Sequence, residues 1–239
     1  KFAHIHLASC QDSADRVRKL GEQEFRIFNV GAPQLDNIVG IDYQADSVYI
    51  GGQNINLTEP YFLLVQHPIL VEKSEAEAQM TETVAAVISS GLRVIWIYPN
   101  ADLGYKNIID VIQSQNIDDH LITLKNVERE AYLTLLANAK ALIGNSSSGI
   151  LEAPSFRIPV LNIGNRQRGR MQASNILNCN HSREDIVAKI DVVLNDANFQ
   201  EKVIAAVNPY GDGKSGPRIC EILCNIALDR ALIDKHTTY

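Results

Sequence analysis

Residues 140–164 read KALIGNSSSGILEAPSFRIPVLNIG, and their pattern is the clearest indication of the class of fold. The stretch opens with a short apolar run, passes through a turn rich in serine and glycine, and closes with a second apolar run at 159–164. Two buried strands joined by a segment of helical length are typical of a βαβ unit with parallel strands. The serines Ser146–Ser148 therefore lie where a strand gives way to a helix, which we expect to follow Gly149.

The same alternation of apolar strands and amphipathic helices runs through most of the chain. The strands of this pattern are expected at 61–68, 92–99, 121–125, 140–146 and 159–164. Such a rhythm predicts an α/β, Rossmann-like domain with a doubly wound, mostly parallel sheet over residues 60–210. Residues 1–39 are expected to form the final βαβ segment of a preceding domain of the same kind, 40–59 a linker, and 211–239 a C-terminal helix region.

Composition narrows the classes of partner. The chain has 239 residues and a formal net charge of −6, which argues against a nucleic acid or an anionic membrane surface as partner. Its longest apolar runs are broken by polar residues or proline, and its first residues lack the pattern of a signal peptide. The four cysteines show neither a CxxC pair nor metal-ligand spacing, so we expect a reduced, cytoplasmic protein without a bound metal. Cys220 and Cys224 share one face of a helix expected at 216–233, where we predict that they lie in the core.

Polar or special residues stand at the ends of the predicted strands. These are His67, Asn100, Lys125, the serines and the pair Asn165-Arg166. In doubly wound sheets, ligands bind beyond the carboxyl ends of the strands. We therefore expect the candidate site at this edge of the sheet.

The Ser/Gly turn has two interpretations. At the start of a helix the first backbone N–H groups are unpaired and the dipole is positive, so a phosphate can bind there. The alternative is an ordinary serine N-cap without a ligand. Glu152 could likewise complement the helix dipole or accept hydrogen bonds from the hydroxyls of a ribose.

His67 and the arginines are also open to two interpretations each. His67 precedes Pro68, which cannot continue the strand ladder, and is either a buried core histidine or a phosphate donor or proton-transfer group. The segment RQRGR at 166–170 is either a solvated loop or a source of guanidinium groups for a diphosphate. GDGKSG at 211–216 is not a P-loop, because its spacing is wrong and no strand precedes it.

Four motifs together carry a resemblance to a known family. They are GNSSSGILEAPSFRIPVLNIGNRQRGR at 144–170, QHP at 66–68, YPNADLG at 98–104 and NPYGDGKSGPRI at 208–219. With FNVGAPQLDNI at 28–38, this series resembles the hydrolysing UDP-N-acetylglucosamine 2-epimerases, closest to the sialic-acid-pathway branch. The resemblance implies a GT-B architecture of two Rossmann-like domains, of which this chain would carry the C-terminal half and the tail of the N-terminal domain.

The resemblance also implies roles for the residues around the Ser/Gly turn. Ser146 and Ser147, with the backbone around Ser148 and Gly149, would hold the diphosphate of UDP. Glu152 would bind the ribose hydroxyls.

The remaining residues carried over from the family lie in the loops after other strands. Arg166 would belong to the UDP site, and His67 matches the family histidine that follows the first C-terminal strand. Asn100 would lie near the uracil or the sugar, and Lys125 near the loop that borders the base.

The implied reaction needs no metal or redox cofactor. UDP is lost by elimination across C1–C2 to give 2-acetamidoglucal, and water then adds to give N-acetylmannosamine. The family's acidic residues for proton transfer at C2 lie upstream of Lys1, so His67 is the one catalytic candidate here. We expect this chain to supply the UDP-binding half and to be inactive alone. Its partner would be UDP or a UDP-N-acetylhexosamine, and the full-length enzyme would be a homo-oligomer, either a dimer or a tetramer.

Three alternatives remain open from the sequence. The first is a hydrolysing 2-epimerase of a UDP-diacetamido-trideoxy sugar in legionaminic acid synthesis. The second is a GT-B glycosyltransferase, and the third is a non-catalytic module that binds UDP-sugars.

Overall fold

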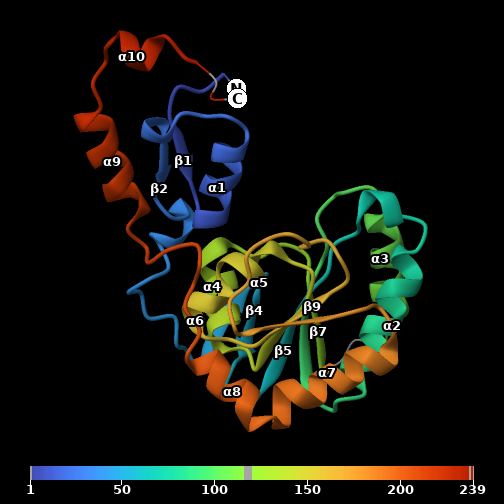
Figure 1. The fold of residues 1–239 in the computed structure, drawn as a ribbon. Coiled ribbons are helices and arrows are strands. Elements are labelled where there is room, and N and C mark those ends of the chain that lie inside the picture. Colours follow the sequence, from blue (N-terminus) through green and yellow to red (C-terminus); the bar gives the residue numbers. More distant parts are fainter. Residues whose placement is uncertain (1, 116–119, 237, 239) are drawn as a thin grey trace. The chain divides into compact units, whose positions relative to one another are not determined.

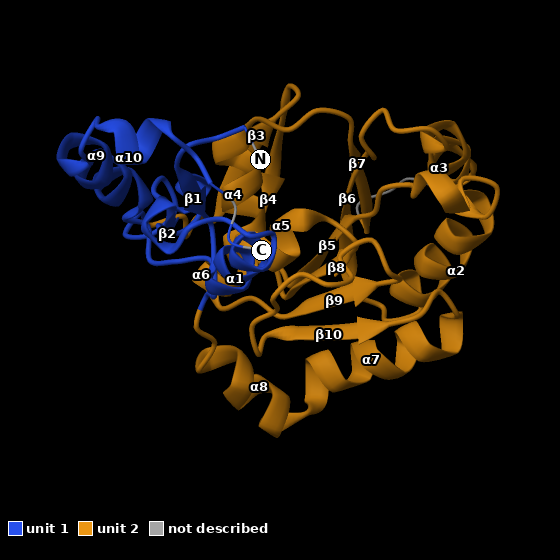
Figure 2. Ribbon diagram, turned by 45° about the horizontal axis from the view of Figure 1, so that its top comes forward, with its two compact units in different colours: residues 1–41, 208–239 blue, residues 42–207 orange. Residues whose placement is uncertain are grey.

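The computed structural model describes residues 2–115, 120–236 and 238. The chain forms two compact units, shown in different colours in Figure 2. Unit 1 comprises residues 1–41 and 208–239, and unit 2 comprises residues 42–207.

A parallel sheet organises unit 2, with the strand order β10-β9-β8-β5-β6-β7 (Figure 2). The strands are β5 Tyr61–Val65, β6 Arg93–Ile97, β7 Leu121–Leu124, β8 Ala141–Gly144, β9 Val160–Ile163 and β10 Ile176–Cys179. Leu63 of β5 pairs with Leu142 of β8 on one side and Ile95 of β6 on the other. The chain adds β6 and β7 on one side of β5, then crosses over to add β8, β9 and β10 on the other. The predicted doubly wound α/β fold is therefore confirmed, and its topological switch point lies between β5 and β8.

Helices cover both faces of this sheet, as Figure 1 shows. One face carries α2 Ala76–Ile88, α3 Tyr105–Ser114, α7 Arg183–Asn195 and α8 Ala197–Ile204; the other carries α4 Arg129–Asn138, α5 Ser147–Leu151 and α6 Ala153–Phe156. Strand β5 alternates between them: Phe62 and Leu64 pack in one core cluster, and Tyr61, Leu63 and Val65 in the other. Among the described residues, no helix is both long and apolar enough to cross a membrane.

A β-hairpin occupies part of the segment 40–59, where we expected a linker. Strands β3 Ser47–Ile50 and β4 Gln53–Asn56 pair in antiparallel fashion, and the turn between them has positive φ at both glycines. Ile50 and Ile55 are buried in the same cluster as Leu63, so the hairpin belongs to unit 2. Apolar residues at alternate positions produce this buried face, a pattern that the glycine-rich composition obscured. The assignment of the remaining segments to domains stays a prediction.

Unit 1 contains a small βαβ element. Strands β1 His6–Ala8 and β2 Ile27–Asn29 are parallel and are joined through α1 Gln11–Lys19 and the 3-10 turn η1 Glu24–Arg26. A further 3-10 turn, η2 Pro33–Leu35, follows β2, and the chain returns to this unit after residue 207 with the helices α9 Ser215–Asn225 and α10 Arg230–Ile233. The single helix expected at 216–233 is thus broken after Asn225. Cys220 and Cys224 are exposed, so their prediction as core residues was wrong; on α9 the buried position is Ser215.

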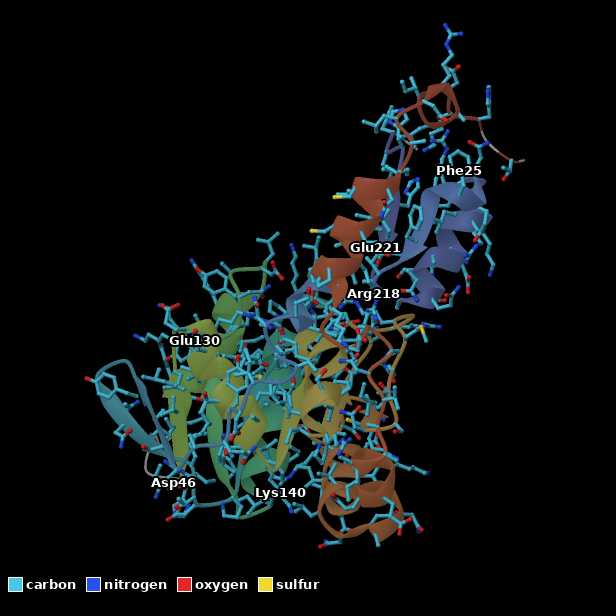
Figure 3. All side chains as sticks on the ribbon, turned by 90° about the vertical axis from the view of Figure 1, so that its left-hand side faces the viewer. Phe25, Asp46, Glu130, Lys140, Arg218 and Glu221 are labelled. Atoms are coloured by element: carbon cyan, nitrogen blue, oxygen red, sulfur yellow. The ribbon has the colours of Figure 1, made fainter. Side chains whose placement is uncertain are left out.

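The loop GDGKSG is tied to η2 through a carboxylate. Asp36 Oδ1 accepts a hydrogen bond from the Ser215 amide at 2.9 Å, and Asp36 Oδ2 accepts one from the Gly216 amide at 2.5 Å. Arg218, labelled on α9 in Figure 3, donates to both carboxylate oxygens of Asp212 at 2.7 and 2.8 Å. A side-chain cap from elsewhere in unit 1 therefore satisfies the first amides of α9.

Candidate functional site

The predicted site residues follow successive strands of the parallel sheet in unit 2. His67 follows β5, Asn100 follows β6, Lys125 follows β7, the serines follow β8 and Arg166 follows β9. Because the strands are parallel, all of these residues lie at the carboxyl edge of the sheet. In Figure 3, Glu130 marks the α4 end at this edge, and Lys140 marks the opposite edge, where β8 begins.

Strand β8 ends in a glycine that allows a close approach to β5. Gly144 has φ of +122°, and a Cβ built on it would lie 2.2 Å from the Val65 carbonyl oxygen. No other residue type fits there without moving the backbone. The next residue, Asn145, is thereby placed directly at the switch point.

Asn145 joins the ends of three strands through hydrogen bonds. Its side-chain Oδ1 accepts from the His67 amide at 2.7 Å, and its Nδ2 donates to the His67 carbonyl at 2.8 Å. Its own carbonyl accepts from Arg166 Nη1 at 3.1 Å and from Gln167 Nε2 at 2.8 Å. Asn145 and Gln167 are only 2% and 1% exposed. We did not predict either residue from sequence; the signal was a polar side chain directly after a buried strand, inside the motif already singled out.

His67 is a neutral hydrogen-bond donor at neutral pH. Its Nδ1 accepts from the Asn100 amide at 3.1 Å, so the ring proton is on Nε2. Burial, reinforced by the nearby positive charge of Arg166, lowers the pKa of His67 to about 4, while Asp102 acts in the opposite direction. Asp102 in turn accepts from Asn100 Nδ2 at 2.7 Å. Three of the predicted residues, His67, Asn100 and Arg166, are thus held in one assembly.

The serine turn is an N-cap. Ser146 has extended backbone geometry, its Oγ accepts from the Ser148 amide at 3.4 Å, and α5 begins at Ser147. The prediction that the helix follows Gly149 was therefore wrong, because the hydroxyl cap brings the serines into the first turn. Gly149 lies inside α5, where an added Cβ would come within 2.9 Å of Val160 Cγ1, so it permits close packing of helix on sheet.

Tyr132 of α4 extends the hydrogen bonding of this turn. Its hydroxyl forms a hydrogen bond with Ser148 Oγ, and Ser148 Oγ lies 2.9 Å from Ser146 Oγ. Burial raises the pKa of Tyr132 above its ordinary value, so the phenol stays protonated at neutral pH. We did not predict this residue, because nothing in the local sequence of α4 indicates its contact with the serines.

Glu152 is a buried carboxylate at the junction of α5 and α6. It is 6% exposed, and its Oε1 accepts from Arg129 Nη1 at 3.0 Å. It lies beyond the first turn of α5 and makes no side-chain cap on α6. Although Glu152 occupies the N-cap position of the four-residue helix α6, its side chain bonds to a half-exposed guanidinium and does not cap that helix.

Lys125 is more distant from the switch point. It is exposed, and β6 separates its strand β7 from β5. Its predicted place beside a base stays a prediction, as do the ligand roles of the other residues.

The edge thus combines hydrogen-bond donors with a buried carboxylate. The neutral imidazole of His67, the guanidinium of Arg166 and the hydroxyl and amide groups of the serine turn are groups that bind anions. Glu152 offers carboxylate oxygens that can accept hydrogen bonds from neutral hydroxyls.

The sequence is similar to proteins of one known family. A family model described as UDP-N-acetylglucosamine 2-epimerase matches residues 1–224. All 239 residues are similar, at 30% identity, to 62% of the Legionella pneumophila protein named UDP-N,N'-diacetylbacillosamine 2-epimerase (hydrolyzing). A UDP-N-acetylglucosamine 2-epimerase of Neisseria meningitidis serogroup B is 28% identical over 204 residues. The matched region covers 84% of this chain and 52% of that protein. The chain therefore spans between half and two thirds of the length of these curated relatives.

Solved structures resemble the chain in fold. The crystal structure of a Neisseria meningitidis UDP-GlcNAc 2-epimerase bound to UDP-GlcNAc matches with a TM-score of 0.73 and 15% identity, over 94% of this chain and 62% of that chain. A likeness at this identity is evidence of fold alone. It confirms the predicted fold class, the C-terminal half of a GT-B architecture.

Proposed function

Because the chain belongs to the UDP-N-acetylglucosamine 2-epimerase family, we propose that the carboxyl edge of its sheet binds the UDP of a UDP-N-acetylhexosamine. In this proposal the chain supplies the UDP-binding half of a hydrolysing 2-epimerase, which converts UDP-N-acetylglucosamine and water to N-acetylmannosamine and UDP. The observation that carries it is the position of Asn145, which links His67, Arg166 and the serine turn at the switch point. Ligands of doubly wound sheets bind at such points.

The diphosphate would meet the donors of the edge. Ser146 and Ser147, the amides around Ser148 and Gly149, and Arg166 would share its negative charge. Burial lowers the pKa of Arg166, but the guanidinium stays a cation at neutral pH, because arginine side chains are not deprotonated in proteins. These fixed donors would stabilise UDP as it leaves, without reorganisation of solvent.

The nucleoside and sugar would meet the remaining residues. Glu152 would accept hydrogen bonds from the two ribose hydroxyls, with Arg129 holding one carboxylate oxygen. Asn100 and Lys125 would border the base or the sugar. His67 would donate Nε2–H to an oxygen of the ligand.

Elimination across C1–C2 removes a proton from C2 and breaks the bond from C1 to the diphosphate, giving 2-acetamidoglucal and UDP. Hydration of the glucal then gives N-acetylmannosamine. A histidine with a pKa of about 4 is a weak base, so His67 suits hydrogen bonding to the leaving group better than removal of the C2 proton. We therefore expect the chain alone to bind UDP and to release no product.

A second substrate has support from the sequence comparison. The Legionella relative, similar over the whole chain, is named for UDP-N,N'-diacetylbacillosamine. The residues placed here contact mainly UDP in this proposal, so both sugars fit them. Assays of the full-length enzyme with each UDP-sugar, with product analysis, distinguish the two substrates.

Calorimetry of UDP binding tests the proposal. We expect Ser147→Ala, Glu152→Ala and Arg166→Ala each to weaken binding by about tenfold, or roughly 1.4 kcal/mol. Arg93→Ala is the matched control, because Arg93 begins β6 at the opposite edge of the sheet and donates to the Asn56 carbonyl. If none of the three variants weakens UDP binding more than the control does, the site assignment is wrong.

A further inference from the structure

Three hydroxyl groups from two elements form a series beside the proposed diphosphate position. Tyr132 of α4 hydrogen-bonds to Ser148 Oγ, and Ser148 Oγ hydrogen-bonds to Ser146 Oγ at 2.9 Å. Ser146 Oγ also accepts from the Ser148 amide at 3.4 Å. The direction in which the protons point along this series decides whether Ser146 offers a proton or a lone pair to a ligand.

The phenol sets that direction. A phenol is more acidic than a serine hydroxyl, and a serine oxygen is the better acceptor, so the proton between them belongs to Tyr132. Burial keeps Tyr132 protonated, as described above. Ser148 Oγ still carries its own proton when it receives the phenolic one, and Ser146 Oγ, at 2.9 Å, is an acceptor within reach of that proton.

Ser146 is then left with one option. Its oxygen has two lone pairs, and these accept from the hydroxyl and the amide of Ser148. In this arrangement its own proton points away from the series. A proton is what an anion needs, whereas a lone pair in that position would repel a phosphate oxygen.

We infer that Tyr132 is a positioning residue, which orients the hydroxyl series so that Ser146 donates its proton to the diphosphate of the ligand. This inference rests on the proposed function and adds to it a residue outside the motif that carries the family resemblance. Tyr132 then acts on the recognition of the diphosphate and not on the recognition of the nucleoside.

Tyr132→Phe tests this claim, because it removes the phenolic oxygen and keeps the ring. The affinities of the parent and the variant are measured for UDP and for uridine by ligand-observed NMR, which reaches millimolar dissociation constants. We expect Tyr132→Phe to weaken UDP binding by about fivefold to tenfold, as for loss of one hydrogen bond, and to change uridine binding by less than about twofold.

Tyr61→Phe is the matched control. Tyr61 is also buried, and its hydroxyl donates to the Leu135 carbonyl at 2.6 Å, within the core of unit 2. Its loss should lower stability and leave the ratio of UDP to uridine affinity unchanged.

A second pair of variants tests the series itself. If Tyr132 acts through Ser146, then Tyr132→Phe should weaken UDP binding by less than about twofold in a Ser146→Ala background. Effects that multiply in the double variant would overturn the inference, because they would show independent roles.

The outcomes separate this inference from the proposed function. If the parent binds UDP no more tightly than uridine, the diphosphate site is absent and both proposals are wrong. If the parent prefers UDP and Tyr132→Phe keeps that preference, or weakens UDP and uridine equally, the positioning role alone is overturned.

Discussion

Asn145→Asp is the substitution that isolates the contact between β5 and β8. The two side chains have the same shape, and Asp keeps an oxygen to accept from the His67 amide. It loses the Nδ2 donor to the His67 carbonyl, a hydrogen bond of 2.8 Å. The change therefore removes the amide donor of Asn145, a residue that is 2% exposed, and leaves the His67 carbonyl without this hydrogen bond.

The magnitude follows from what is lost. An unsatisfied buried carbonyl costs about 1–3 kcal/mol, and a carboxylate oxygen facing it adds repulsion. Arg166, which donates to the Asn145 carbonyl at 3.1 Å, offsets part of that repulsion. We expect a net loss of about 2–3 kcal/mol in the free energy of unfolding of unit 2.

Urea unfolding followed by tryptophan fluorescence measures this loss. Trp96 is the only tryptophan in the sequence, and it is fully buried in β6, so it reports on the core of unit 2. The expected shift of the midpoint is about 1 M urea for a slope of about 2–3 kcal/mol per M. Asn56→Asp is the matched control, because Asn56 is exposed and its Oδ1 accepts from the amide and hydroxyl of Thr58, a role that a carboxylate oxygen can keep.

The control should change stability by less than about 0.5 kcal/mol, as a surface substitution that keeps its hydrogen bonds. If the urea midpoint of Asn145→Asp lies as close to the parent midpoint as that of Asn56→Asp does, the side chain of Asn145 does not hold β5 and β8 together. The account of how His67 is placed would then be wrong.

Three further predictions follow from the same structure. The Hε1 resonance of His67, assigned by its absence in His67→Gln, should titrate near pH 4, and a midpoint near 6.5 would contradict the burial argument. Because the pKa of His67 in the folded state lies below its value of about 6.5 in the unfolded state, the free energy of unfolding should fall as the pH decreases from 6.5 to 4. Gly144→Ala should cost about 3 kcal/mol or more in urea unfolding, against about 1 kcal/mol for Gly91→Ala, which has positive φ but open space around the added Cβ; equal losses would show that the contact with β5 is unimportant. Asp36→Ala should destabilise the start of α9 by about 1–2 kcal/mol, seen as faster hydrogen exchange of the amides that Asp36 accepts from, and unchanged exchange would exclude the cap.

The fold was predictable because its signals are local. Apolar runs such as 61–65 and 141–144 are bounded by polar or glycine residues, and the helices between them have amphipathic patterns, so periodicity alone indicated a parallel sheet. The position of the candidate residues at one edge of the sheet could also be predicted, because the carboxyl ends of parallel strands lie at the same edge. The hairpin at 47–56 was missed, since its short strands and two-glycine turn resemble a loop in composition.

What the sequence could not show depends on contacts between distant segments. The bonds from Asn145 to His67 span 78 positions, and the contact of Tyr132 with Ser148 links two helices. The low pKa of His67 arises from burial and from Arg166, neither of which has a local signature. The helix start at Ser147 was missed because serine favours both caps and loops, and only the backbone geometry decides between them.

A crystal structure of this chain with UDP would show directly whether the carboxyl edge of the sheet holds the nucleotide. We expect the diphosphate within hydrogen-bond distance of Ser146, Ser147 and Arg166, and the ribose hydroxyls on the carboxylate of Glu152. UDP bound at another part of the chain, or at this edge with the diphosphate turned away from the serine turn, would contradict this expectation.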